Sequence, residues 1–264
     1  MEESFYFWAS YHQPLRVFFQ GDSWLHFSPP IRDYPDLAAA APDSSGNLWI
    51  GLDGGGLLRL RRRSATTLSK RDGLRSNNIM TMTQDHQGQV WAGAVGSAGG
   101  LTWIDPETME TQFNGDGWPN GLLISSLLSS RSGVGWVGGA LSGLHVYENE
   151  VFTPVAAPPG VHAFDAQTAI TALFEDSRNR LWVGTRQTGL ALLDGPRSRD
   201  FQTQHGLTHD RVTGISETPD GTIWVGTIRG LNAISPSGSI DHYDSESGLP
   251  VDRIHCVFTD SRGR

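Results

Sequence analysis

The chain has 264 residues, a length that one closed all-β architecture can occupy. It contains 32 glycines and 9 tryptophans, and 18% of its residues are charged, which suits many short strands joined by tight turns with aromatic side chains packed between sheets. The formal net charge of −8 repels phosphate backbones, so we expect no nucleic-acid partner. One basic run is expected to be a solvated strand end: Arg59, Arg61, Arg62 and Arg63.

The lone cysteine, Cys256, excludes an internal disulfide and any metal site built from several cysteines. It lies in the apolar run Ile254–Phe258, which predicts a small buried side chain. No apolar stretch approaches the roughly 18 residues that a membrane span needs. The N-terminus, Met1–Ser4, is acidic where a secretory signal would be basic. Either the protein is cytoplasmic or the chain is a piece of a longer one.

In chain order, the predicted elements begin with half of a repeat. Phe5–Phe19 contains Trp8, which lies 41 residues before Trp49, and Ser10 stands where later copies have glycine. Strands are expected around Phe5–Ala9 and Arg16–Phe19.

Five full copies follow, each centred on a tryptophan, and the tryptophans are 42 to 46 residues apart. The five anchors are Trp49, Trp91, Trp136, Trp182 and Trp224. Two positions after each anchor stands a glycine: Gly51, Gly93, Gly138, Gly184 and Gly226. Twelve positions before each anchor stands an aliphatic residue: Leu37, Ile79, Ile124, Ile170 and Val212.

Each copy predicts four short strands. In the second copy these include an inner strand over Ile79–Gln84, a tight turn over Asp85–Gly88, a second strand over Val90–Gly93 and a weak outer strand over Thr111–Phe113. Alternating strands and helices are excluded, since no segment keeps a 3.6-residue apolar period over ten residues. Four strands per roughly 44-residue unit are typical of a β-propeller.

The last predicted element is the complementary half-repeat Asp252–Arg264, which matches the lead-in of the other copies. Its inner strand, Ile254–Asp260, is expected to join the N-terminal strands in a composite closing blade, which would remove open sheet edges. We therefore predict an all-β propeller of about six four-stranded blades, forming a single domain over residues 1–264. The alternative is a fragment of a longer repeat array.

The repeated phrase resembles the two-component regulator propeller repeat, of pattern D-x-x-G-x-LW-[IV]-G-T-x-x-G-L. It occurs as Asp43–Leu57 and Asp176–Leu190, and the family's linker is matched at Asp72–Ile79 and Ser247–Ile254. Such repeats are found in extracytoplasmic sensor regions of hybrid histidine kinases and diguanylate cyclases. The resemblance implies a periplasmic or extracytoplasmic sensor for signal transduction, with any kinase or cyclase domain outside this chain. Because the family is usually described as seven-bladed, a truncated seven-bladed propeller is the alternative fold.

A ligand is expected on the face where the second-to-third-strand loops and the linkers between blades emerge together. A small molecule, a glycan or a peptide would fit the resemblance. The candidate residues are Arg75, Asn77, Asn78, Trp118, Asn120, Arg186, His209, Arg229 and Arg253. Trp118 could stack on a sugar ring or fill a blade interface, and Asn77 and Asn78 could cap a turn.

No catalytic signature accompanies the repeats, because HExxH, GxSxG and phosphate-loop motifs are all missing. The nine histidines are dispersed. His205 and His209 alone are close together, and they are expected to be solvent-facing linker residues. The acidic pairs Glu148/Glu150 and Glu175/Asp176 are expected to be solvated. We therefore predict a binding module without metal or cofactor.

Two other functions stay open. A protein–protein assembly scaffold would use the same loop surface. A streptogramin-lyase-like enzyme is the second alternative, because Pro219–Thr227 resembles the repeats of that lyase, although the glutamates that follow its tryptophans are missing here.

Overall fold

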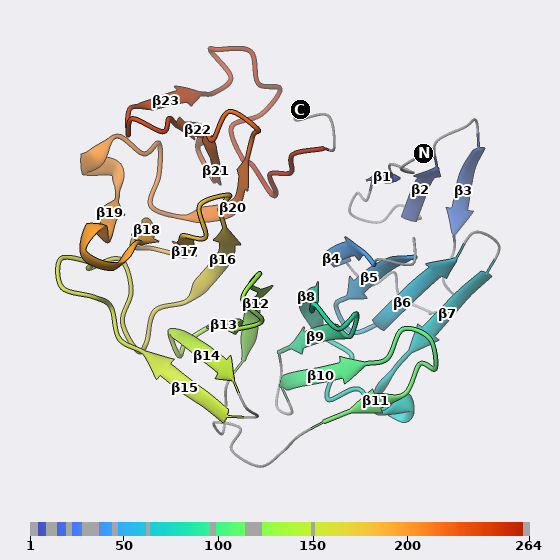
Figure 1. The fold of residues 1–264 in the computed structure, drawn as a ribbon. Coiled ribbons are helices and arrows are strands. Elements are labelled where there is room, and N and C mark those ends of the chain that lie inside the picture. The colour runs from blue at the N-terminus through green and yellow to red at the C-terminus, as the bar shows by residue number, and fades with distance from the viewer. Residues whose placement is uncertain are drawn as a thin grey trace. The chain divides into compact units, whose positions relative to one another are not determined.

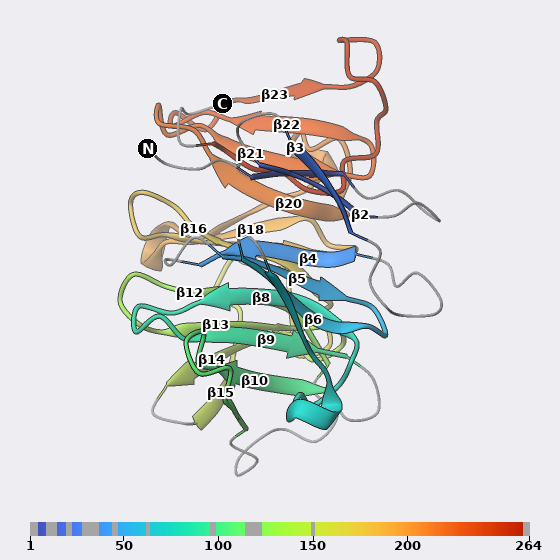
Figure 2. The ribbon, with the colours of Figure 1, turned by 90° about the vertical axis from the view of Figure 1, so that its right-hand side faces the viewer.

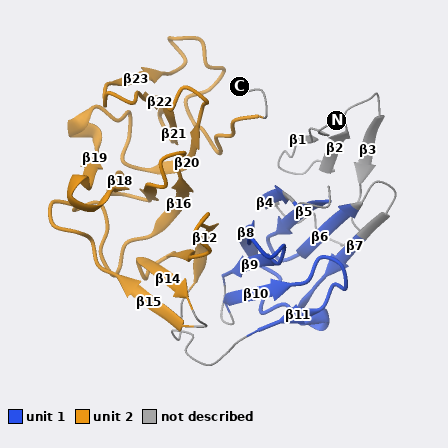
Figure 3. Cartoon of the chain, viewed as in Figure 1, with its two compact units in different colours: residues 1–114 blue, residues 115–264 orange. Residues whose placement is uncertain are grey.

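The computed structural model describes residues 5–8, 15–19, 23–27, 37–43, 47–61, 64–95, 99–113, 123–148 and 151–260. The chain divides into two compact units, Met1–Asn114 (unit 1) and Gly115–Arg264 (unit 2), and each is described by itself (Figure 3). Within the described ranges, the regular structure consists of β-strands and three short 3-10 turns. None of the described helices is long and apolar enough to span a membrane.

Unit 1 holds three antiparallel sheets (Figure 1). The first has three strands: β1 (Phe5–Trp8), β2 (Leu15–Phe19) and β3 (Ser23–Phe27). The second has four: β4 (Leu37–Pro42), β5 (Leu48–Leu52), β6 (Gly56–Arg61) and β7 (Ser64–Leu68). The 3-10 turn η1 (Lys70–Asp72) leads to the third sheet: β8 (Ile79–Gln84), β9 (Val90–Ala94), β10 (Gly100–Ile104) and β11 (Thr111–Gln112). The strands predicted for the second repeat are thus confirmed.

Unit 2 holds three four-stranded antiparallel sheets with strands in sequence order, as Figure 2 shows for the last of them. The first contains β12 (Ile124–Ser129), β13 (Gly135–Gly139), β14 (Leu144–Glu148) and β15 (Val151–Val155). The next contains β16 (Ile170–Glu175), β17 (Leu181–Thr185), β18 (Leu190–Leu193) and β19 (Arg199–Phe201), with the turns η2 (Gly195–Arg197) and η3 (Thr203–His205). The last contains β20 (Val212–Glu217), β21 (Ile223–Thr227), β22 (Gly230–Ile234) and β23 (Ile240–Tyr243).

Successive four-stranded sheets pack against one another within each unit. Their first strands are in contact: β4 with β8 in unit 1, and β12 with β16 and β16 with β20 in unit 2. One shared core in unit 2 joins Trp182 and Leu190 from one sheet to Val225 from the next. The sheet of β16–β19 contacts both the preceding and the following sheet, which is the arrangement of propeller blades.

The glycine that follows each tryptophan allows this close packing. A Cβ atom on Gly184 would lie 2.6 Å from Cγ1 of Val212, the aliphatic residue that opens the next sheet. The same contact recurs between Gly138 and Ile170, at 2.7 Å to Cγ2. Two of the repeated sequence positions therefore form one contact between neighbouring sheets.

In three of the sheets an aspartate ties the first turn to the tryptophan. The indole Nε1–H donates to Oδ2 of the aspartate six residues earlier: Trp49 to Asp43 at 2.7 Å, Trp91 to Asp85 at 2.9 Å and Trp182 to Asp176 at 2.8 Å. In the last sheet Thr218 takes the place of aspartate and accepts from Trp224 at 3.1 Å.

Two expectations about charged side chains were wrong for the same reason. Asp176, expected in solvent, is 0% exposed, because its carboxylate accepts hydrogen bonds from Trp182 and the turn backbone. Arg59, expected at a solvated strand end, is buried, because its guanidinium lies over the Trp49 ring, 5.6 Å from the centroid, and donates to the Pro106 carbonyl. Desolvation of these charges is offset by their hydrogen bonds.

The C-terminal segment occupies the place of a further inner strand but forms no strand pairing within the described residues. Ile254 N donates to Thr227 O at 3.0 Å, and Thr259 Oγ1 lies 2.7 Å from Ser216 Oγ. A Cβ on Gly226 would lie 2.7 Å from Ile254 Cγ2, repeating the contact made by Val212. The prediction that Cys256 is buried is wrong: its side chain is exposed, because no strand of the described residues pairs with the segment there.

Candidate ligand-binding face

Backbone hydrogen bonds repeat where one sheet gives way to the next. The glycine closing the second-to-third-strand hairpin donates its N–H to the residue two positions before the next inner strand. In unit 2 these bonds join Gly143 to Thr168 (3.0 Å), Gly189 to Asp210 (2.9 Å) and Gly230 to Asp252 (2.6 Å). Each hairpin therefore lies beside the linker that leads into the following sheet, as predicted for the loop face. We call these hairpins and linkers of unit 2 the hairpin–linker row.

In unit 1 the predicted binding residues are engaged in local structure. Asn77 Oδ1 accepts from Lys70 N at 2.8 Å, and its backbone carbonyl accepts from Gly56 N at 2.7 Å. The Asn78 carbonyl accepts from Val95 N at 3.1 Å. The Arg75 guanidinium lies over the Phe113 ring, 3.8 Å from its centroid, and is half-buried. The side-chain contact of Asn77 supports the turn-capping alternative for that residue, whereas the contact of Asn78 is made by its main chain.

The capping role of Asn77 recurs at equivalent linker positions. Asp210 Oδ1 accepts from Thr203 N at 2.7 Å, and Asp252 Oδ1 accepts from Ser245 N at 2.7 Å. In each case the acceptor lies seven residues after the donor. A short carboxylate or amide side chain here connects the linker to the turn before it.

In unit 2 four of the predicted residues lie on the hairpin–linker row, and no described residue accepts a hydrogen bond from their side chains. Arg186, Arg229 and Arg253 are exposed, and His209 is half-buried. His209 Nδ1 accepts from Arg211 N at 2.8 Å, so a neutral ring carries its proton on Nε2. Trp118 and Asn120 lie outside the described residues, and their role stays a prediction.

The sequence reading missed Arg211 and a buried polar network beneath the row. Arg211 directly precedes the inner strand, as Arg253 does one repeat later, and this equivalence was available as a sequence signal. Asn232 is 0% exposed; its Oδ1 accepts from Thr208 N at 2.9 Å, and its Nδ2 donates to Val225 O at 3.1 Å. The network holds the linker against the third strand.

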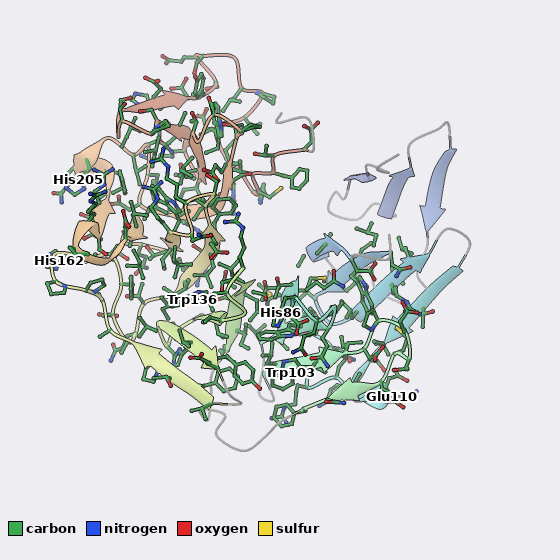
Figure 4. All side chains as sticks on the ribbon, viewed as in Figure 1. His86, Trp103, Glu110, Trp136, His162 and His205 are labelled. Atoms are coloured by element: carbon green, nitrogen blue, oxygen red, sulfur yellow. The ribbon has the colours of Figure 1, made fainter. Side chains whose placement is uncertain are left out.

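The histidines do not converge on a site in the described part of the chain. His205 Nδ1 accepts from Gln202 N at 3.2 Å, so that ring, like His209, serves a local turn. Figure 4 shows His162 and His205 at the outer margin of unit 2. Among the described residues, no group of three or more His, Cys, Asp or Glu could hold a metal ion.

His145 is a buried histidine that the sequence did not single out. It lies on β14, is 6% exposed, and its Nδ1 has no hydrogen-bond partner among the described residues. Burial lowers the pKa of His145, and a backbone hydrogen bond at Gly143 partly opposes this shift. The imidazole is therefore held in its neutral form.

Comparison with solved structures identifies the fold class. The extracellular domain of a protein described as a one component system, from B. thetaiotaomicron, matches 99% of this chain with a TM-score of 0.72 at 20% identity. The extracellular domain of a hybrid two component system from B. thetaiotaomicron matches 95% with a TM-score of 0.56 at 16% identity. The present chain covers 36% and 45% of those two chains. It is thus an all-β protein built from propeller blades.

A virginiamycin B lyase from Staphylococcus aureus shares the same fold at greater sequence distance. It matches 85% of this chain with a TM-score of 0.64 at 15% identity, and 74% of the lyase is covered. A comparison with curated protein sequences found no match. The family model of the two component regulator propeller matches residues 73–96, 166–187 and 206–229, within three of the blades. The chain therefore carries repeats of the two component regulator propeller family.

Proposed function

We propose that this chain is the ligand-binding propeller of an extracytoplasmic sensor that passes a signal to a two-component-type regulator. The family of its repeats supports this proposal, as does the likeness of its fold to extracellular domains of such systems. On this proposal the chain itself is not an enzyme, and any kinase or cyclase activity belongs to another domain.

The observation that carries the proposal is a contrast between two neighbouring sequence positions, one constant and one variable among the repeats. The residue that opens each inner strand is always aliphatic and buried at the described positions Ile79, Ile124, Ile170 and Val212. The residue just before it varies among the repeats, with arginine in the last two: Asn78, Leu123, Ala169, Arg211 and Arg253. Packing between sheets requires an aliphatic side chain where the inner strand begins, whereas varied side chains on the rigid linker just before it suit ligand recognition.

We place the ligand, a small molecule, glycan or peptide, on the hairpin–linker row of unit 2. Arg186, His209, Arg229 and Arg253 supply exposed or half-buried donors there. Trp118 and Asn120 precede β12 in sequence and would extend this surface. Arg75 and Asn77 also hold their own linker through the contacts described above, and Asn78, whose described contacts are made by its main chain, stays a ligand candidate.

Thermal unfolding with a panel of glycans and peptides tests this function. A ligand at 100 times its Kd stabilises a protein by about 2.7 kcal/mol, which is a measurable rise in Tm. We expect a rise with at least one compound, and a smaller rise in the Arg186→Ala variant. If no compound raises Tm while a protein partner is captured through the same row, the assembly scaffold is favoured. Metal-dependent turnover of a streptogramin would favour the lyase alternative, which the shared fold supports.

For the fold we propose six blades, the last a composite of both ends of the chain. The N-terminal sheet has three strands where the other sheets have four. Trp8 lies in its first strand, whereas the other sheets carry the tryptophan in their second strand, so the strand that this sheet lacks is the first one. Ile254–Asp260 has the contacts of a first strand without partners. Ser125, Thr171 and Thr213 occupy equivalent positions, one residue after the start of their inner strands. The first two hydroxyls donate to the next inner strand, Ser125 to Ile170 O and Thr171 to Val212 O. The buried Thr213 hydroxyl has no partner among the described residues.

A disulfide test follows from the register. Ala172 pairs with Gly184 in the fourth repeat, and the equivalent positions of the composite blade are Cys256 and Ser10. In the Ser10→Cys variant we expect an intramolecular disulfide on oxidation, seen as a faster-migrating monomer. Ser23→Cys, on the outer strand, is the matched control. A crosslink of the control alone, or none in either variant, would contradict the composite blade, and a covalent dimer would show exchange between two copies.

A further inference from the structure

Neighbouring sheets of unit 2 are joined by a hydrogen bond between their inner strands, which we call the hydroxyl bridge. The second residue of one inner strand donates to the carbonyl that opens the next, from Ser125 to Ile170 at 2.6 Å and from Thr171 to Val212 at 2.8 Å. Thr213 has the same position in β20, and its buried hydroxyl has no partner among the described residues. This bridge is therefore missing where the segment Ile254–Asp260 meets the last sheet, a contact that we call the closing seam.

A second bond, the carboxylate bridge, joins the same sheets through the glutamate that ends an inner strand. Glu175 accepts from the backbone N–H of Arg131 at 2.8 Å. Glu217 accepts from the N–H and from the hydroxyl of Ser177, at 2.6 and 2.7 Å. In both cases the donor lies in the first turn of the preceding sheet, so each of these two seams carries both kinds of bridge.

At the closing seam the sequence excludes the carboxylate bridge. Pro219 has the place of Ser177 in the turn, and proline has no backbone N–H to donate. Thr259 has the place of Glu217 and carries no carboxylate. Two hydroxyls, Ser216 Oγ and Thr259 Oγ1, lie 2.7 Å apart there instead. The closing seam thus lacks both bridges in the described structure, and residue type alone dictates the loss of one of them.

The aromatic face beside the closing seam is not covered by the described residues. In the sheet β16–β19, the rings of Trp182 and Phe201 are 5.5 Å apart and are 2% and 4% exposed, because they share a core with the following sheet. The equivalent rings of Trp224 and Tyr243 are 5.6 Å apart, yet Trp224 is half-buried and Tyr243 is 38% exposed. Phe258, on the closing segment, is 78% exposed. A further sheet is needed to bury these side chains.

On the proposed composite blade, the N-terminal sheet β1–β3 covers this face, and the linker after that sheet differs from the others. Every other linker between sheets contains a glycine. Gly73, Gly206 and Gly248 have φ values of 102°, 105° and 106°, which a tight turn requires there. Residues 28–36 contain three prolines and no glycine. Because proline-rich segments are extended and stiff, the sequence predicts a linker that can carry β1–β3 to a second molecule.

We infer that the closing seam is an exchange point, at which the N-terminal sheet of one molecule covers the aromatic face of a second copy. This inference rests on the proposed composite blade and goes beyond it, since the blade then forms either within one chain or reciprocally between two. Exchange of an identical element buries the same surfaces in the dimer as in the monomer, so it costs little free energy. A seam with fewer bridges opens more easily than the other two seams of unit 2.

Two chains with one cysteine each test the exchange directly. The native chain has Cys256 alone, and the double variant Ser10→Cys with Cys256→Ser has its cysteine at the facing position of the composite blade. Neither chain can form a disulfide within itself. After mixing at high protein concentration and oxidation, we expect a covalent heterodimer whose yield rises with concentration, identified on a non-reducing gel and by mass spectrometry. Ser23→Cys with Cys256→Ser, on the outer strand β3, is the matched control and should give no heterodimer above background.

Restoring the missing bridge tests why exchange occurs at this seam. Pro219→Ser with Thr259→Glu introduces the pair that Ser177 and Glu217 form at the preceding seam. Pro219→Ser with Thr259→Gln is its control, because it has the same size without the charge. Both chains of each mixture carry the same pair of substitutions. We expect the glutamate variant to form the heterodimer at least about threefold more slowly than the glutamine variant, since a charged acceptor makes the stronger hydrogen bond.

Three results would overturn the inference. If the mixture gives no heterodimer while Ser10→Cys alone forms its disulfide within one chain, exchange is excluded and the composite blade stands. A heterodimer that is equally abundant in the Ser23→Cys control, or equal rates for the glutamate and glutamine variants, would show that the closing seam is not the exchange point. If neither the mixture nor the single variant forms a disulfide, the composite blade fails together with the exchange, and the panel of glycans and peptides still tests the sensing function.

Discussion

The aspartate–tryptophan turn makes the sharpest prediction about stability, at Asp176. This carboxylate is 0% exposed and accepts from Trp182 Nε1 at 2.8 Å, from the backbone N–H groups of Arg178 (3.0 Å) and Arg180 (2.9 Å), and from Arg180 Nε at 2.7 Å. The variant Asp176→Ala removes all four acceptor contacts and leaves the surrounding donors in place.

The expected loss of unfolding free energy follows from what is left behind. A buried donor without an acceptor costs about 1–3 kcal/mol, and the Trp182 indole becomes one. Loss of one member of a buried ion pair costs about 3–5 kcal/mol, but the Arg180 side chain is 18% exposed and can turn to water, which favours the low end. We therefore expect a loss of about 3 kcal/mol.

Urea unfolding followed by tryptophan fluorescence measures this loss. Asp241→Ala, at an exposed carboxylate of β23, is the matched control and should change stability by less than about 0.5 kcal/mol. Asp176→Thr introduces the residue that Thr218 provides in the last sheet, where it still accepts from Trp224, so its loss should be smaller than that of the alanine variant. A loss under about 1 kcal/mol for Asp176→Ala would refute the structural role.

Four further predictions concern pH, packing and exposure. Burial raises the pKa of Asp176, but the hydrogen bonds from Trp182 and Arg180 and the Arg180 charge outweigh burial and lower the pKa. The ionised Asp176 therefore stabilises the fold above about pH 4, and this contribution is lost as the pH falls through the lower folded-state pKa. The acid-induced loss of stability should be smaller in Asp176→Asn. Gly184→Ala should lower the free energy of unfolding by about 1–3 kcal/mol, because the new Cβ would lie 2.6 Å from Val212. If the double variant with Val212→Ala lost as much stability as the two single variants together, that would speak against this contact. Burial lowers the pKa of His145, so its neutral form stabilises the fold above about pH 6.5 and the benefit fades as the pH falls through the folded-state pKa; equal acid destabilisation of native chain and His145→Asn between pH 7 and pH 5 would count against it. Cys256 is exposed among the described residues, whereas the proposed composite blade would cover it, so slow reaction with a thiol reagent without denaturant is expected and rapid reaction would count against that blade.

Much of the fold could be predicted because the frame is local and repeated. The tryptophan, the glycine two positions later and the aliphatic residue that opens the inner strand recur in phase, and the structure shows that the last two meet across neighbouring sheets, as Gly184 meets Val212. The turn before each tryptophan was also readable, since Asp85–Gly88 forms it as expected. Alternation over short strands carries this information within a few residues.

The partners of charged side chains could not be predicted in the same way. Asp176 and Arg59 look like surface residues in the sequence, and only the packing of the turn and of the adjoining sheet removes them from water. The bond from Lys70 N to the Asn77 amide oxygen is likewise not visible in the sequence. A side chain's exposure depends on residues far along the chain, which no local pattern specifies.

By itself, therefore, the sequence determined the repeat, the four strands of each copy and the class of propeller blades, because these depend on short-range periodicity. The tertiary structure decided which arginines stay unpaired on the hairpin–linker row and which acids are taken up by turns, since hydrogen bonds between a linker and a preceding turn or hairpin select among similar polar residues. It also decided that Ile254–Asp260 lies against β20 without a strand ladder among the described residues, because its contacts with the preceding sheet are single hydrogen bonds, at Ile254 N and Thr259 Oγ1.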